Sequence, residues 1–344
     1  FAFRMLGLFM VLPVLATWGQ QLQGATPFLI GMAIGAYGLT QAFLQIPFGM
    51  LSDRVGRKPV IVFGLLLFAA GGLVAAGADS ITQVIAGRVL QGAGAIAAAV
   101  MALVADSTRE QHRTKAMAMI GMSIGLAFAV AMVAGPVVAR MAGLGGVFLS
   151  TSALALVGIV LVLLAVPTPQ QTQPHRDAGV VRGALWPSLA NGQLLRLNYG
   201  IACLHAILMA TFLAIPLALQ QQAGLAKEDH WWVYLAALLL SFFGMVPFII
   251  YAERQRQMKR VMLGAVAVLA LVQPLFWLSQ HSLPWLVAAI ILFFVGFNLL
   301  EATLPSLLSK IAPAGGKGTA MGVYSTSQFA GAALGGMFGG WLFA

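Results

Sequence analysis

The sequence is short of charged residues and of cysteine, and each shortage excludes a class of protein. Charged residues make up 8% of the chain, hydrophobic residues make up 60%, and the mean hydropathy is +0.93. A soluble domain contains far more charge than this, so a soluble fold is excluded. Cys203 is the only cysteine, which rules out an intrachain disulfide and a metal site made of several thiolates.

Motifs for nucleotide and metal chemistry are missing as well. No segment matches the glycine-rich loop with a lysine that holds the phosphates of ATP. The five histidines show no spacing typical of metal ligands. We therefore expect a protein that is not an enzyme and carries no cofactor, and whose process is driven by a gradient rather than by ATP, or is passive.

Eleven apolar segments are each long enough to cross a bilayer, which takes about 20 residues in a helix. They are residues 3–19, 28–51, 60–77, 82–105, 114–138, 146–166, 197–219, 231–252, 261–278, 285–309 and 318–344. This pattern predicts an all-α, polytopic bundle of membrane helices. Because Phe1 already lies in the first segment and the last segment reaches the end of the chain, we expect that the start of the first helix and a twelfth helix are missing.

Basic residues distinguish the two faces of this bundle. Most of the 19 lysines and arginines lie in one alternate set of loops, whereas Arg140 and Lys227 lie in the opposite set. Short cytoplasmic loops carry the excess of positive charge, so the first set faces the cytoplasm. The net charge of +10 then reflects topology and an attraction to anionic lipid, and no nucleic acid is expected as a partner. We expect a multi-pass protein of a bacterial inner membrane.

One hydrophilic stretch divides the segments into a group of six and a group of five. Residues 167–193 are rich in proline, glutamine and other polar residues. They predict a cytoplasmic linker between an N-terminal half, residues 1–166, and a C-terminal half, residues 194–344. Within the linker, residues 180–187 are expected to lie as an amphipathic segment at the membrane surface.

The two halves share a short pattern at the cytoplasmic ends of their second helices. Ile46-Pro47-Phe48 followed by Asp53-Arg54 corresponds to Val246-Pro247-Phe248 followed by Glu253-Arg254. Such an echo indicates parallel structural repeats, which in transporters place the substrate site between two halves.

A charged and glycine-rich loop joins the second and third segments. It reads Gly49-Met50-Leu51-Ser52-Asp53-Arg54-Val55-Gly56-Arg57-Lys58-Pro59. Gly49 allows a close helix approach and Gly56 permits a turn, and neither is needed merely to place charge on one face. This loop resembles the signature loop of the major facilitator superfamily of transporters.

Three further segments extend this resemblance over nearly the whole chain. Gly87-Arg88-Val89-Leu90-Gln91-Gly92-Ala93-Gly94-Ala95 resembles the embedded arginine motif of that family. The fifth segment resembles the glycine-proline motif of the antiporter branch through Gly121, Gly125, Ala131, Gly135 and Pro136. It departs from that motif at the end, where Ala139 and Arg140 replace the closing glycine pair. Leu6-Gly7 with Leu12-Pro13-Val14 resembles the first helix of twelve-span drug:proton antiporters. Within that branch, Phe297-Asn298-Leu299-Leu300-Glu301-Ala302 is most similar to the bacterial YajR-type group.

The resemblance implies a fold of two six-helix halves that expose a central cavity alternately to each side of the membrane. It also implies that Asp53 faces the N-terminus of the eleventh helix, near Gly318, where the helix dipole stabilises an anion. Arg57 would then pair with Asp106. In this interpretation the cytoplasmic gate is closed by Gly49, Asp53, Arg54, Gly56, Arg57, Lys58 and Asp106. The alternative is that these charges only anchor the hairpin at the membrane surface.

Four ionisable residues lie within apolar segments, where charge is costly and indicates function. Glu301 is the leading candidate to carry a proton, because burial disfavours its charged form and lets it bind a proton near neutral pH. His205 is the second candidate, although a lone histidine is more often a hydrogen-bonded structural group. Arg88 is expected to face the cavity near Gln91 or to bond to backbone carbonyls. Arg4 is a candidate countercharge to Glu301 or His205.

Polar and small residues on the predicted helices complete the candidate site. The polar residues are candidates to line a substrate cavity: Tyr37, Gln41, Gln45, Gln91, Asn198, Asn298, Tyr324 and Gln328. Glycines on the fifth and eleventh segments are expected to let the two halves pack closely and rock, with ordinary helix packing as the alternative: Gly121, Gly125, Gly135, Gly331, Gly335, Gly336, Gly339 and Gly340. Pro136 lies within the fifth segment, where a kink is tolerated.

Three functions remain open from the sequence. The first is a proton-coupled antiporter that exports drug-like or metabolite molecules, which the fifth-helix motif favours. The second is a proton symporter or facilitator that imports a small polar nutrient. The third is a membrane receptor on a transporter scaffold, because a fold alone does not prove flux. The expected partners are a small-molecule substrate, protons and membrane lipid, and a monomer is favoured.

Overall fold

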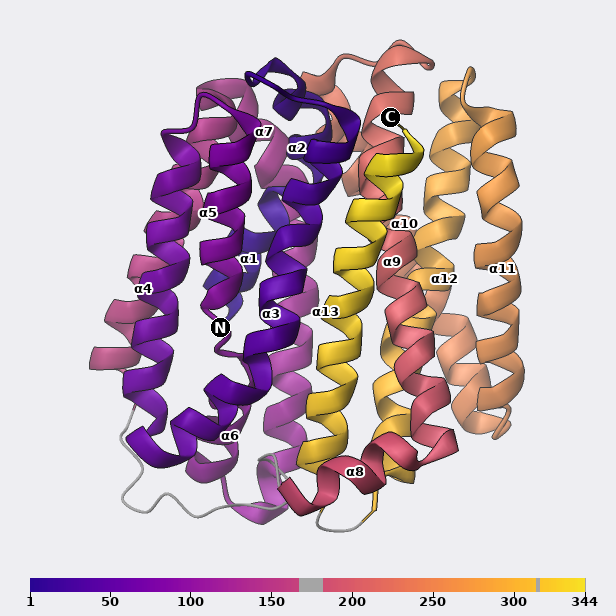
Figure 1. Ribbon diagram of the computed structural model, residues 1–344. Helices are drawn as coiled ribbons and strands as arrows, with labels where there is room; N and C mark the ends of the chain where they lie inside the picture. Colours follow the sequence, from indigo (N-terminus) through magenta and orange to yellow (C-terminus); the bar gives the residue numbers. More distant parts are fainter. Residues whose placement is uncertain (167–181, 314–315, 344) are drawn as a thin grey trace.

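The computed structural model describes residues 1–166, 182–313 and 316–343, and Figure 1 shows them as a bundle of long helices. Most of the predicted linker, residues 167–181, lies outside this range. The helices of the N-terminal half are α1 (Ala2–Met10), α2 (Leu12–Trp18), α3 (Pro27–Val55), α4 (Arg57–Ala76), α5 (Ile81–Ala93), α6 (Ala97–Ser107) and α7 (Glu110–Leu164). Those that follow are α8 (Arg182–Ala190), α9 (Gly192–Gln221), α10 (His230–Arg254), α11 (Met258–Ser279), α12 (Leu283–Ile311) and α13 (Lys317–Leu342).

The helices account for the predicted membrane crossings. Nine helical segments of the described chain are long and apolar enough to span a membrane. One of them is α7, where Gly143 (φ 67°, ψ −170°) breaks the 55-residue helix into two arms that match the predicted fifth and sixth segments. The predicted eleventh segment is α13, which falls outside the nine because its many glycine and hydroxyl residues lower its hydropathy. Counting both arms and adding α13 gives eleven crossings (9 + 1 + 1) in the described residues. The all-α membrane fold is confirmed.

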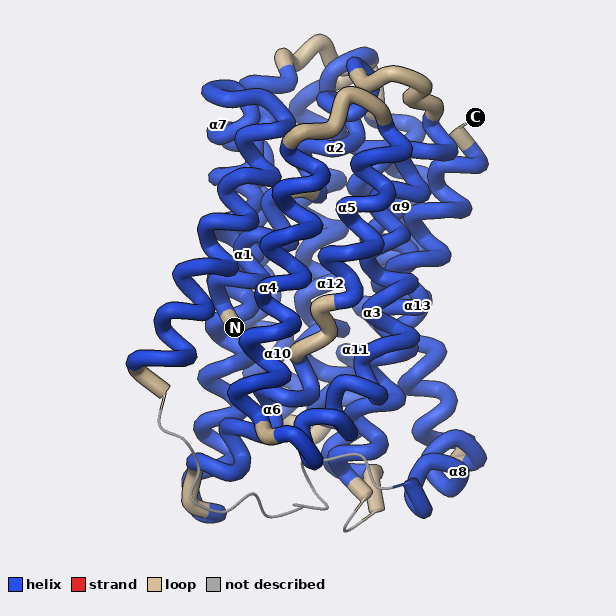
Figure 2. Tube along the Cα trace, turned by 60° about the vertical axis from the view of Figure 1, so that its left-hand side comes forward, coloured by secondary structure: helices blue, strands red, loops and turns tan. Residues whose placement is uncertain are grey.

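Two crossings are broken at membrane depth. Val11 separates α1 from α2, and residues 94–96 separate α5 from α6, where Figure 2 shows a short loop inside the bundle. A Cβ on Gly94 would lie 2.2 Å from the carbonyl oxygen of Gly64, so only glycine allows α4 to come this close. Irregular backbone at this depth is tolerated where it is buried in protein. The break at residues 94–96 therefore marks a place where polar groups can gather inside the N-terminal half, whereas Val11 keeps helical dihedral angles (φ −72°, ψ −31°).

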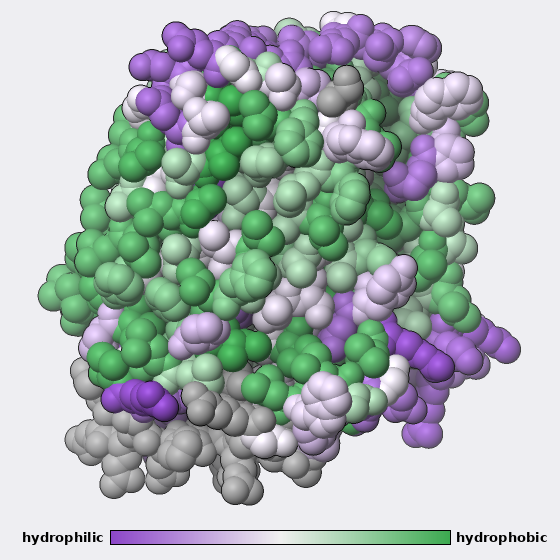
Figure 3. All heavy atoms as spheres, in the orientation of Figure 1, coloured by the Kyte–Doolittle hydropathy of each residue, from purple (hydrophilic) through white to green (hydrophobic). Residues whose placement is uncertain are grey.

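The helix ends and the outer surface follow ordinary membrane-protein chemistry. Thr26 caps α3 by accepting a hydrogen bond from Leu29 N, and Ser80 with Gln83 forms a capping box at the start of α5. Large apolar side chains such as Phe43, Leu126 and Leu271 are exposed. In Figure 3 apolar residues cover the middle of the molecule and hydrophilic residues gather at its ends, as expected for a surface in contact with lipid.

The two halves meet most closely where α3 runs beside α13. A Cβ on Gly31 would lie 2.2 Å from Gly336 O, and one on Gly35 would lie 2.6 Å from Ala333 O. Farther along α3, Gly49 approaches Ala98 of its own half instead. Figure 1 shows that this lower part of α3, which contains Pro47, turns toward α4 and away from α13. The closest contacts between the halves therefore lie on the side opposite the basic, cytoplasmic loops.

α8 supplies the predicted surface segment of the linker. It lies across the cytoplasmic end of the bundle in Figure 1 and contacts α9 and α13. Trp186 of α8 is exposed, as a residue at the membrane interface would be. The predicted boundaries of the two halves, 1–166 and 194–344, stay a prediction.

Candidate functional site

The signature loop folds as a tight hairpin between α3 and α4. Gly56 lies between the two helices with φ 104° and ψ 153°, a backbone conformation that favours glycine. The buried Arg57 then points back into the protein. Its Nη1 donates to Ser52 Oγ at 2.7 Å and pairs with the Asp53 carboxylate, and its Nε donates to Asp106 Oδ2 at 2.9 Å. One guanidinium thus links α3, α4 and α6.

Burial differs between the two carboxylates that contact Arg57. The side chain of Asp106 is 1% exposed, whereas that of Asp53 is 33% exposed. A buried pair is costly to break from one side because the remaining charge stays desolvated. The Arg57–Asp106 pair is the one that the family resemblance implied. Arg54 is exposed and Lys58 is half-buried, so these two residues lie at the cytoplasmic surface of the hairpin.

The structure gives Asp53 a different partner from the expected one. The resemblance implied that its carboxylate faces the start of α13, but in the described residues its hydrogen bond and its ion pair are with Arg57, four residues along the chain. The physical reason is the bend of α3, which carries its cytoplasmic end toward α4 (Figure 1). The gating role of the loop stays a prediction.

Arg4 anchors a buried polar network in the N-terminal half. Its Nη2 donates to Tyr37 Oη at 2.7 Å, to Gln41 Oε1 at 3.0 Å and to Gly94 O at 2.9 Å. Gln41 in turn donates to Gln45 at 2.9 Å. Arg4 therefore binds neutral groups of its own half here, and its described contacts include neither of the residues for which it was a candidate countercharge.

Arg88 joins the same network from α5. It donates to Ala33 O at 3.2 Å, which is the backbone bond of the alternative interpretation, and to Gln91 Oε1 at 3.1 Å. The Arg88 guanidinium lies 4.8 Å from the centroid of the Tyr37 ring and that of Arg4 lies 5.8 Å from it. Tyr37 is thus held between two cations. Arg88 is 1% exposed, so it lies inside the N-terminal half and does not face an open cavity.

A second polar cluster lies in the C-terminal half. His205 on α9 is close to Glu301 on α12, with 3.9 Å between Nε2 and Oε2, and Gln328 Nε2 on α13 is 2.8 Å from the same His205 nitrogen. Glu301 Oε2 is buried and makes no hydrogen bond in the described part of the chain, although 41% of the side chain is exposed. One oxygen therefore faces the imidazole while the rest of the carboxylate stays accessible. The two proton candidates form one site.

The remaining polar candidates divide between this cluster and helix packing. Tyr324 is 4% exposed and its hydroxyl makes no hydrogen bond among the described residues, and the same holds for Asn198 Oδ1. Asn298 instead donates to Ser241 Oγ of α10 at 3.2 Å. It therefore holds α12 against α10, which is a structural role inside the C-terminal half.

The glycines expected between the halves serve several different interfaces. Gly121 and Gly125 do not pack closely, because a Cβ at either position would have no described atom within 4 Å. A Cβ on Gly135, which precedes the buried Pro136, would lie 2.4 Å from Met10 O, within the N-terminal half. On α13, three glycines face α9 of the same half: Gly331, Gly335 and Gly339. Two others, Gly336 and Gly340, face α3 across the interface between the halves. Only the last set fits the expected contact between halves.

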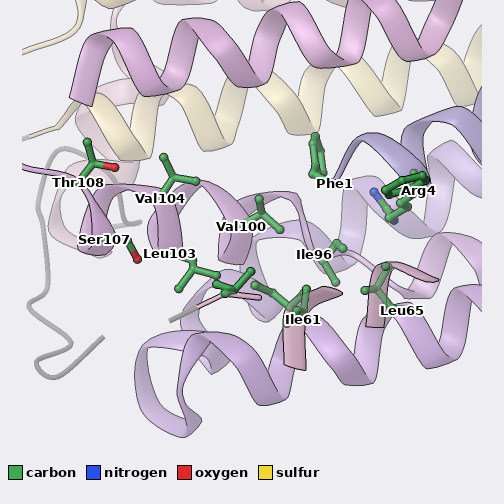
Figure 4. A pocket seen from close by; sticks show the side chains of 14 residues that line it. Phe1, Arg4, Ile61, Leu65, Ile96, Val100, Leu103, Val104, Ser107 and Thr108 are labelled. Carbon is green, nitrogen blue, oxygen red and sulfur yellow. The ribbon is translucent and has the colours of Figure 1, made fainter. Parts of the chain in front are cut away.

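One apolar cavity of about 240 Å³ lies in the N-terminal half, beside the first residue (Figure 4). Its walls come from α4, α6 and the second arm of α7, with Ile61, Leu103 and Val162 among them. Arg4 lines it, but none of the eight polar residues expected to line a substrate cavity does. This cavity is therefore not the predicted substrate site.

Two hydroxyl residues of these networks, Ser52 and Thr151, were not predicted as site residues. Ser52 is fully buried, donates to Gly49 O at 2.7 Å and accepts from Arg57. Its place inside the signature loop was the signal that could have found it. Thr151 accepts from Gln91 Nε2 at 3.0 Å, and no local pattern marks it because the contact joins residues 60 positions apart.

Comparison with known sequences identifies the family. The model of the Major Facilitator Superfamily matches residues 1–336. The inner membrane transport protein YajR of Escherichia coli is 56% identical over 342 residues, which are 99% of this chain and 75% of that protein. An uncharacterised transporter of Buchnera aphidicola is 36% identical over 337 residues, 96% of this chain and 85% of that protein. The multidrug resistance protein MdtH of Aeromonas hydrophila is 27% identical and covers 97% of this chain and 82% of its own length.

Two solved structures have the same fold. A D-xylose-proton symporter superposes with a TM-score of 0.72 at 15% identity, covering 99% of this chain and 88% of that one. The nucleoside transporter NupG superposes with a TM-score of 0.73 at 12% identity, covering 99% and 91%. Sequence and fold agree with a multi-pass protein of the inner membrane that transports rather than catalyses. This chain belongs to the Major Facilitator Superfamily of membrane transporters.

Proposed function

We propose that this protein is a proton-coupled antiporter that exports drug-like or metabolite molecules by alternating access. The observation that carries the proposal is the pair of His205 and Glu301 inside the membrane helices, 3.9 Å apart. Ionisable groups at this depth are costly and persist where they serve a pathway. A carboxylate with one buried oxygen and an accessible remainder can take up a proton from one side and release it after the protein has changed conformation.

Two further observations support export. The glycine-proline motif of α7 resembles that of the antiporter branch, and one relative at 27% identity is named as a multidrug resistance protein. The close α3–α13 contact lies on the side opposite the basic loops, which suits a state that opens to the cytoplasm and loads its substrate there. In this scheme the protein acts as a monomer in the lipid bilayer, and the proton gradient supplies the energy without a cofactor.

Transport in proteoliposomes tests this function. The purified protein is reconstituted with a pH-sensitive dye inside the vesicles, a pH gradient is imposed, and a panel of organic cations, neutral drug-like compounds, sugars and nucleosides is added. Proton movement opposite to the substrate supports antiport. Movement in the same direction identifies a symporter, and binding without flux identifies a receptor.

Replacing Glu301 with glutamine is expected to abolish proton-driven transport. The amide has the shape of the carboxylate but cannot take up and release a proton, so we expect at least a tenfold loss of gradient-driven uptake, whereas exchange of labelled for unlabelled substrate without a gradient continues. Glu253→Gln is the matched control, because Glu253 is exposed at the cytoplasmic end of α10. Unchanged gradient-driven uptake in Glu301→Gln would remove this residue from the mechanism.

A further inference from the structure

Two adjacent residues of α13 link the proton site to the interface between the halves. Successive side chains of a helix point about 100° apart, so neighbours contact different partners. Gln328 contacts His205 inside the C-terminal half. Phe329 contacts the other half: its ring centroid is 6.3 Å from that of Tyr37 on α3, and its carbonyl oxygen would lie 2.8 Å from a Cβ on Gly38. The residue of α13 that contacts His205 is therefore the immediate neighbour of the residue that contacts α3.

The hydrogen bond from Gln328 selects one form of His205. An amide nitrogen only donates, so Gln328 Nε2 at 2.8 Å requires the imidazole Nε2 to accept, which is the neutral ring with its proton on Nδ1. When Nε2 gains a proton, two donors face each other at hydrogen-bond distance. Gln328 must then rotate its amide or move away, and the new N–H faces the buried oxygen of Glu301, 3.9 Å from the imidazole nitrogen. Protonation thus breaks the hydrogen bond that α13 donates and adds an attraction to α12.

The N-terminal half offers Phe329 a firm surface. The Tyr37 hydroxyl accepts from Arg4 at 2.7 Å, and the Arg88 guanidinium lies 4.8 Å from the centre of the ring. Tyr37 is 3% exposed and packs edge-on against Phe68 as well. Because this ring is held from several sides, a displacement of Phe329 acts on α3 as a whole.

We propose that Gln328 and Phe329 are positioning residues that transmit the protonation state of His205 to the contact between α3 and α13. The inference rests on the proposed function, in which His205 and Glu301 form the proton site. Among the described residues, Glu301 from α12 faces the imidazole and Tyr324 from α13 lies near Glu301, with Tyr37, Arg4 and Arg88 beyond the interface.

A distance measurement across the cytoplasmic side tests the proposal without any substrate. Spin labels are placed on Val55→Cys at the end of α3 and Lys317→Cys at the start of α13, both exposed positions, in a Cys203→Ser background. The full chain is reconstituted in lipid nanodiscs, and the distance distribution is recorded by pulsed electron paramagnetic resonance from pH 5 to 9. We expect the distance to change with pH around a single midpoint. A distribution that does not respond to pH would overturn the proposal.

Gln328→Leu is expected to move this midpoint to higher pH by about half a unit to one unit, because the neutral imidazole loses a hydrogen bond and the protonated form gains in comparison. A merely structural role would lower stability without moving the midpoint. The matched control is Gln273→Leu on α11, since among the described residues that amide donates to Leu269 O of its own helix and to no other helix. An unmoved midpoint in Gln328→Leu contradicts the proposal.

Phe329→Leu is expected to at least halve the amplitude of the distance change, because the ring that reaches Tyr37 is gone. Phe276→Leu is its control, since Phe276 packs on Phe293 within the C-terminal half. Glu301→Gln and His205→Gln distinguish a failure of the proton site from a failure of its transmission to the α3–α13 contact. If they abolish the pH response while the Phe329 variant keeps it, the proton site stands and the transmission fails; if they leave the response intact, the proposed proton site itself fails.

Discussion

Replacing Gly31 with valine is expected to drive the protein out of the conformation described above. The closest contact between the halves is made of backbone: a Cβ on Gly31 would lie 2.2 Å from Gly336 O and 2.7 Å from Gly340 Cα. Backbone atoms cannot rotate aside as a flexible side chain can. Overpacking of this kind costs about 1–3 kcal/mol, which shifts a two-state equilibrium by about 5- to 150-fold.

The direction of the shift follows from the position of the clash. It lies between the two halves, so separating α3 from α13 on the outer side relieves it without unfolding either half. Under alternating access this favours the state that is closed toward the cytoplasm. The distance between spin labels at positions 55 and 317, on the cytoplasmic side, is therefore expected to shorten, and export is expected to fall because the loading state is depleted.

Two variants control for effects of valine itself. Gly264→Val places the same side chain on α11, where a Cβ would have no described atom within 4 Å, and it should leave both distance and stability unchanged. Gly335→Val creates a clash inside one half, 2.1 Å from Ala206 O, and should lower the melting temperature without shortening the distance. A Gly31→Val protein that melts early but keeps the parental distance would show that this contact is structural and not part of a switch.

The crossings could be predicted because they depend on local composition, whereas the orientation and the linker stay predictions drawn from the same kind of signal. Hydropathy over about 20 residues and the side on which basic residues gather are both readable from one sequence. The break at residues 94–96 was not predicted. It depends on which helices approach each other, as Gly94 does to α4, and hydropathy carries no information on that.

The sequence singles out the candidate site residues one by one but not their arrangement. His205 and Glu301 were recognised because each is ionisable within an apolar segment, yet only the structure brings them within 3.9 Å. The bond from Arg4 to Gly94 O spans 90 positions and depends on the α5–α6 break. Gly121 and Gly125 were wrongly expected to pack closely, because a stripe of small residues does not tell which face meets a partner.

Arg57→Met is expected to be the most destabilising change in the signature loop. Arg57 and Asp106 have side chains that are 4% and 1% exposed, so removal of the guanidinium takes a charged partner from a desolvated carboxylate. The loss of one partner from a buried pair costs about 3–5 kcal/mol. The same substitution also removes the bond to Ser52, so α4 loses a polar link to α3 as well as the one to Asp106 of α6. The measurement is the free energy of unfolding from an SDS titration in mixed micelles.

Three comparisons distinguish this network from generic hairpin charge. Arg54→Met, an exposed arginine three residues earlier, should change stability by less than about 0.5 kcal/mol. Asp53→Asn should cost about 0–1 kcal/mol, because a carboxylate that is one-third exposed behaves as a surface partner and Arg57 still holds Asp106. Arg57→Met combined with Asp106→Leu should recover part of the loss, since no carboxylate is then left buried. If Arg57→Met costs no more than Arg54→Met, the loop acts through its charge at the membrane surface and the buried pair does not hold the three helices together.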